Sequence, residues 1–77
     1  MTIAQASRVS GVPRATIQRN IERGILSAYE SEDGLQIRPC EFLDYCLSRY
    51  GKLIWGRPVM MFSPDVIRSN IESLLDD

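Results

Sequence analysis

The run Gly11-Val12-Pro13 constrains this chain more than any other feature, because it separates two short amphipathic segments. Thr2 is a good helix N-cap and Gln5 completes a capping box, so a helix is predicted over residues 3–9. Glycine supplies the positive φ of a tight turn, and proline suits the first turn of a helix, where its missing N–H has no cost. The sequence therefore predicts two helices joined by a tight turn, with Val12 as the apolar side chain that plugs it.

The second helix is predicted over residues 14–23, and Gly24 ends it. Ile17 and Ile21 are four residues apart and therefore share one face, which we expect to point into the core. Ile25 and Leu26 then continue the core. The opposite face is expected to be in solvent and carries Arg14, Ala15, Gln18, Arg19 and Glu22.

A hairpin and a third helix follow. Asp33-Gly34 is a strong turn signal between residues 27–32 and 35–38. Leu35 and Ile37 alternate with polar residues, which indicates one packed and one wet face. Pro39 ends the strand and begins a helix that runs to about Tyr50. The apolar face of this helix is predicted to consist of Phe42, Leu43, Cys46, Leu47 and Tyr50.

The C-terminal part of the chain is rich in apolar residues. Pro58 excludes a central strand, so residues 52–62 are predicted to form an extended arm or an edge strand. Ser63-Pro64-Asp65 is a strong helix start, and the helix is expected to reach about Leu75. Its apolar stripe consists of Ile67, Ile71, Leu74 and Leu75.

Charge is distributed unevenly along the 77 residues, although the net charge is only −1. Residues 1–27 contain four arginines and one glutamate, a balance of +3, whereas residues 28–77 contain five basic and nine acidic residues, a balance of −4. A positive N-terminal end on an otherwise acidic protein is typical of a chain with one small phosphate-facing surface.

Several classes of function are disfavoured by composition. The chain has no histidine and two cysteines, Cys40 and Cys46, which cannot complete a four-ligand zinc site and which we interpret as small buried hydrophobes in a reducing compartment. It also lacks a glycine-rich phosphate loop, so we expect no enzyme activity, cofactor or metal. No apolar stretch is long enough to span a membrane. The expectation is one soluble, cytoplasmic domain.

Residues 2–19 resemble the helix-turn-helix of the lactose-repressor class, through the small residue Ser7, the Gly11-Val12 turn and the pair Thr16-Ile17. With Gly24-Ile25-Leu26, the hairpin and the helix after Arg38-Pro39, the order is similar to the winged helix-turn-helix of MerR regulators and of small phage and plasmid excisionases. The likeness covers about residues 2–50. It implies a mainly α fold with a winged helix-turn-helix DNA-binding module at 1–50. The likeness does not cover the C-terminal arm and helix at 51–77, which we interpret from its apolar residues as a dimerisation extension.

The same resemblance assigns roles to residues. Residues 13–23 become the recognition helix, which lies in the major groove with its N-terminal half against the base edges. Arg14 and Arg19 would pair with guanine or phosphate, and Gln18 with adenine. The alternative for these three residues is that they form a solvated helix face and contact no DNA. The implied DNA-binding residues are Ser10, Pro13, Arg14, Ala15, Thr16, Gln18, Arg19, Arg23 and Arg38.

Two departures from the family pattern leave alternatives open. The hairpin tip carries Glu30, Glu32 and Asp33, which phosphate would repel, so it either points away from DNA, leaving only Arg38 near it, or contacts protein. The tail of 27 residues has no effector domain, so no small-molecule effector is expected. Its apolar residues either fold back over the core or form a homodimer interface. The predicted interface consists of Trp55, Met60, Phe62, Ile67, Ile71, Leu74 and Leu75.

The leading hypothesis is a small sequence-specific DNA-binding protein, a repressor-type transcriptional regulator that binds double-stranded DNA as a homodimer. An excisionase-like architectural factor fits the same residues. A third alternative is a winged-helix module that binds protein, as an inhibitor, and not DNA.

Overall fold

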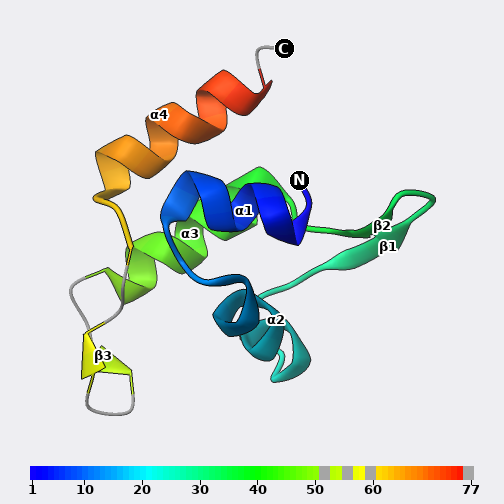
Figure 1. Ribbon diagram of the computed structural model, residues 1–77, viewed down its shortest axis with the longest axis horizontal. Coiled ribbons are helices and arrows are strands. Elements are labelled where there is room, and N and C mark those ends of the chain that lie inside the picture. The colour runs from blue at the N-terminus through cyan, green and yellow to red at the C-terminus, as the bar shows by residue number, and fades with distance from the viewer. Residues whose placement is uncertain (51–52, 55–56, 59–60, 76–77) are drawn as a thin grey trace.

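The computed structural model describes residues 1–50, 53–54, 57–58 and 61–75. Within them the chain is mostly helical, with four helices and two short antiparallel hairpins (Figure 1). None of the described helices is long and apolar enough to cross a membrane. The elements in chain order are α1 (Ile3–Ser10), α2 (Arg14–Glu22), β1 (Tyr29–Ser31), β2 (Gly34–Gln36), α3 (Pro39–Arg49), β3 (Leu53–Ile54), β4 (Arg57–Pro58) and α4 (Pro64–Leu75).

The start of α1 and the turn after it follow the sequence prediction. The Thr2 hydroxyl accepts from the Gln5 amide at 3.1 Å, and the Gln5 side chain accepts from the Thr2 amide at 2.9 Å. Both bonds of the capping box are therefore present. Gly11 adopts φ +79°, and its amide donates to the Ser7 carbonyl at 2.8 Å. This left-handed residue ends α1 and turns the chain toward α2.

The end of α2 differs slightly from the prediction. Pro13 is the N-cap, so the helix begins at Arg14 as predicted, but it ends one residue early at Glu22, with Arg23 as the C-cap. At that end the Asn20 carbonyl accepts the amides of Ile25 at 2.9 Å and Leu26 at 3.2 Å. This arrangement turns Leu26 into the core but leaves Ile25 exposed, so the prediction that both continue the core is wrong for Ile25.

The first hairpin has a different turn from the predicted one. Ser31 pairs with Gly34, so the turn residues are Glu32 and Asp33 rather than Asp33 and Gly34. The Ser31 hydroxyl accepts from the Asp33 amide at 3.3 Å and donates to the Gly34 carbonyl at 3.0 Å, which closes the turn one residue earlier. Figure 1 shows this hairpin projecting from the helices, and only Ile37, just beyond it, is fully buried.

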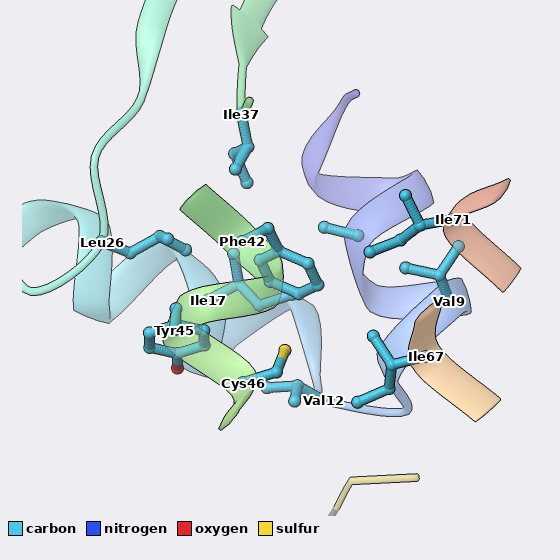
Figure 2. Close-up of a cluster of buried hydrophobic side chains, with 11 residues drawn as sticks. Val9, Val12, Ile17, Leu26, Ile37, Phe42, Tyr45, Cys46, Ile67 and Ile71 are labelled. Carbon is cyan, nitrogen blue, oxygen red and sulfur yellow. The ribbon is translucent and has the colours of Figure 1, made fainter. Parts of the chain in front are cut away.

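One core joins all four helices (Figure 2). On α3 the inner side chains are Phe42, Tyr45 and Cys46, at the i, i+3, i+4 spacing of one helix face. The sequence interpretation missed Tyr45 and placed Leu47 and Tyr50 inward, but both are exposed. Leu47 lies on the neighbouring row of the helix, and Tyr50 is the C-cap, where the backbone is already extended. The core residues are Ala6, Val9, Val12, Ile17, Leu26, Ile37, Phe42, Tyr45, Cys46, Ile67 and Ile71.

The C-terminal helix α4 folds back over α1 and α3. Ile67 and Ile71 fill the core beside Val9 (Figure 2), so these two side chains are not available for the dimer face that the sequence predicted. Asn70 Nδ2 also donates to the Val9 carbonyl at 3.0 Å. The two parts divided at residue 50 thus share one core. Dimerisation itself stays a prediction.

The remaining tail residues are placed as follows. Leu74 is partly buried, whereas Phe62 and Leu75 are exposed. Trp55 and Met60 lie outside the described residues. The predicted arm contains β3 and β4, which pair only with each other, so Pro58 lies in a two-stranded ribbon where a missing amide donor is tolerated.

Candidate nucleic-acid interface

The outer face of α2 is a solvent-exposed surface with two arginines. Arg14, Gln18 and Arg19 are all exposed, as is Ala15 between them. The helix is anchored from behind by Ile17, which is fully buried. In the part of the chain that the structure describes, neither Arg14 nor Arg19 forms a salt bridge. Both guanidinium groups can therefore donate hydrogen bonds to an external anion or to a base edge.

The start of α2 adds main-chain donors to this surface. Pro13 is exposed and provides no side-chain cap, and the first helical hydrogen bond joins the Ile17 amide to the Pro13 carbonyl at 3.1 Å. The amides of residues 14–16 precede that bond and have no partner inside the helix. They lie at the positive end of the helix dipole, where anions are favoured. One of these amides belongs to Thr16, a residue that is partly buried.

Ser10 does not belong to the exposed surface, contrary to the prediction. Its side chain is fully buried. The hydroxyl donates to the Ala6 carbonyl at 2.7 Å and accepts from the Val12 amide at 3.1 Å. Ser10 therefore builds the turn between α1 and α2 and is not available to a phosphate.

The two outlying arginines of the predicted set are placed differently from the α2 pair. Arg38 is at the base of the hairpin, where a guanidinium nitrogen lies 3.8 Å from a Glu41 carboxylate oxygen. Its guanidinium carbon also lies 5.0 Å from the centre of the Tyr29 ring, a cation–π distance. Arg23 is exposed at the end of α2, where its amide donates to the Arg19 carbonyl at 3.0 Å. Neither is grouped with Arg14 at the start of the helix.

The hairpin carries the opposite charge to α2. Glu30, Glu32 and Asp33 are all exposed. In Figure 1 the hairpin extends to one side of the helices, whereas α2 lies below α1. The acidic tip therefore projects away from the helical body, and it offers phosphate only repulsion.

A buried polar pair behind α2 was missed from the sequence. Asn20 Nδ2 donates to the Tyr45 hydroxyl, and both residues are almost fully buried. Burial raises the pKa of Tyr45, opposed in part by the hydrogen bond from Asn20. The burial of Tyr45 could have been predicted from its position three residues after Phe42 on α3. No sequence pattern indicates that a single asparagine in a short helix is buried.

The cysteines are free thiols in different surroundings. Cys46 is buried, as expected, and burial raises its pKa to about 12. Cys40 is exposed at the first turn of α3, which corrects the expectation that both are buried. Among the described residues no group of histidine, cysteine, aspartate or glutamate is arranged to hold a metal ion.

No protein-family model matches the chain, and no curated protein or solved structure matches it. The resemblance to MerR regulators and excisionases thus stays a prediction made from the residues.

Proposed function

We propose that this chain is a winged helix-turn-helix protein that binds double-stranded DNA, with α2 as its recognition helix. The observation that carries the proposal is the exposed face of α2, on which Arg14 and Arg19, beside Gln18, form no salt bridge with any described residue. The turn at Gly11 and the core behind Ile17 hold this face outward. The projecting hairpin between α2 and α3 corresponds to the wing.

The chemistry of the α2 face suits the major groove. Arginine donates two parallel hydrogen bonds to guanine O6 and N7, and glutamine pairs with adenine N6 and N7. Arg14 and Gln18 are four residues apart and so lie one above the other along the helix. The unpartnered amides at the start of α2 add a phosphate contact that fixes the register on the duplex.

The biological role that we propose is sequence-specific regulation of the repressor type. An excisionase-like role, in which the protein acts as an architectural factor on DNA, would use the same face. A homodimer would present two α2 helices to two half-sites about one helical turn apart. Sedimentation at micromolar concentration separates a dimer from the 8.7 kDa monomer.

The proposal is tested with Arg14→Ala and Arg19→Ala on a duplex selected from a random pool. We expect each variant to weaken specific binding by about 1–3 kcal/mol where the contact is to a base. The matched control is Arg68→Ala, because Arg68 is also exposed but lies on α4, which Figure 1 shows on the other side of α1 from α2. Thermal unfolding of each variant verifies that it is folded. Undiminished affinity in both α2 variants would overturn the assignment.

A second candidate function is favoured by the acidic hairpin tip. Exposed Glu30, Glu32 and Asp33 are better suited to a protein surface than to phosphate. On this alternative the chain is a winged-helix module that binds protein as an inhibitor. A salt titration distinguishes the two, because DNA affinity falls steeply as the logarithm of salt concentration rises. Failure to bind any duplex at low salt, together with a co-purifying protein, would favour the protein-binding module.

A further inference from the structure

A single buried polar contact joins α2 to α3 through side chains. Asn20 on α2 is 7% exposed and Tyr45 on α3 is 6% exposed. The Asn20 side-chain amide donates to the Tyr45 hydroxyl inside the core. A buried amide needs such a partner, since an unsatisfied donor carries its full desolvation penalty. The structure therefore holds Asn20 at one place on α3.

The apolar side chains that anchor α2 decide which face points inward but fix its exact rotation only coarsely. Ile17 is buried and Ile21 is partly buried, and both contribute apolar contact. Apolar burial is non-directional, so a rotation of about 15° leaves Ile17 and Ile21 in the core with little loss of buried area, although a large rotation would expose Ile17. A hydrogen bond weakens steeply when its angle departs from linear. The bond from the Asn20 side chain is thus the α2 contact most sensitive to a small rotation.

Tyr45 is a rigid anchor for that bond. Its ring stacks on Phe42 with centroids 5.8 Å apart and an interplanar angle of 26°. The Arg49 guanidinium carbon also lies 5.0 Å from the centroid of the same ring. The ring is thereby clamped within α3, and any adjustment between the two helices must be made by α2.

We propose that the hydrogen bond from Asn20 to Tyr45 sets the rotation of α2, which makes Asn20 a positioning residue for base recognition by Arg14, Gln18 and Arg19. This inference rests on the proposed function. Asn20 is adjacent to Arg19 in the helix, so a rotation that moves one moves the other. At a helix radius of about 5–6 Å, a rotation of about 15° displaces a side chain by about 1.5 Å. Productive recognition geometry tolerates only about 0.5 Å.

The expected signature is a loss of specificity rather than of affinity in general. Contacts to phosphate are made by long, flexible side chains and tolerate a displaced helix, whereas paired hydrogen bonds to a base edge do not. Loss of the bond to Tyr45 should therefore lower binding to the selected site and leave binding to unrelated duplex almost unchanged.

The test is Tyr45→Phe, which keeps the ring and removes the hydroxyl that Asn20 contacts. Dissociation constants are measured for the selected duplex and for an unrelated duplex at one salt concentration. We expect the ratio of specific to non-specific affinity to fall about tenfold, with non-specific binding within about twofold of wild type. Tyr50→Phe is the matched control, because it is the same substitution at an exposed tyrosine at the end of α3. Its ratio of specific to non-specific affinity should equal that of wild type.

A general loss of stability must be separated from a positioning role. Ile71→Val weakens the core without touching the polar pair, and its ratio should equal that of wild type. Asn20→Ala should lower the ratio of specific to non-specific affinity as much as Tyr45→Phe does. It replaces Tyr45→Phe in the test where that variant does not fold. The positioning role of Asn20 is refuted if the affinity ratio is unchanged in a folded Tyr45→Phe or Asn20→Ala variant, or if it falls equally in Ile71→Val. Either result leaves the proposed DNA binding intact. A wild-type chain that prefers no duplex refutes the proposed function, and this inference with it.

Discussion

Replacement of Ile67 by alanine tests whether α4 belongs to the core of this chain. Ile67 is 0% exposed and lies beside Val9 and Val12 (Figure 2). Truncation of a buried isoleucine to alanine lowers the free energy of unfolding by about 2–5 kcal/mol. At about 4–8 °C per kcal/mol for a domain of this size, a loss of about 3 kcal/mol lowers Tm by about 12–24 °C. A chain of this length has only about 4–12 kcal/mol in total.

The matched control is on the same helix. Leu75 is 63% exposed, so Leu75→Ala should change stability by no more than about 0.5 kcal/mol. Thermal and urea unfolding followed by circular dichroism measure both variants. Ile67→Val, expected to lose about 0.5–1.5 kcal/mol, keeps the measurement possible where the alanine variant does not fold. Equal stability of the two alanine variants would contradict packing of α4 within the chain, as would a loss for Ile67→Ala that depends on protein concentration.

The remaining predictions concern the turn and the thiols. Gly11 and Gly24 both have positive φ, but a β-carbon at Gly11 would lie 3.1 Å from the Phe62 ring and one at Gly24 would meet nothing within 4 Å. Gly11→Ala should therefore lower the free energy of unfolding by more than Gly24→Ala, each by at least about 1 kcal/mol in urea, and equal losses would contradict the contact with the ring. Ellman's reagent at neutral pH should label exposed Cys40 and spare buried Cys46 until the chain unfolds. Because burial raises the pKa of Cys46 from 9.0 to about 12, its thiol favours the folded state below pH 9.0, and this stabilisation should be lost as pH rises toward 12. Simultaneous labelling of both thiols in the folded protein would show that Cys46 is not buried.

Helix boundaries were predictable because their signals are local. The capping box of Thr2 and Gln5 involves residues three apart, and both of its bonds are present. The starts of α3 and α4 at proline and the turn at Gly11 likewise depend on one or two adjacent residues. Each feature is decided by backbone φ or a nearby hydrogen bond, so the same residues produce it in almost any tertiary context.

Side-chain burial was less predictable, because it depends on partners far away in the sequence. Leu47 and Cys46 are adjacent apolar residues on α3, yet only Cys46 enters the core. The direction in which α3 faces is decided by the core that it shares with the other helices, α4 among them, and not by its own periodicity. Ile25 is exposed for a local reason instead, since the Asn20 carbonyl accepts its amide and holds the chain just after α2.

The exposed arginine face of α2 was therefore determined by the sequence: Gly11 and Pro13 set the start of the helix, and Ile17 selects the face opposite Arg14 and Arg19. Only the tertiary structure decided what supports that face. The buried bond from Asn20 to Tyr45 spans 25 residues, and the bond from Asn70 that holds α4 on α1 spans 61. Contacts of that separation depend on the packing of whole helices, which no local pattern specifies.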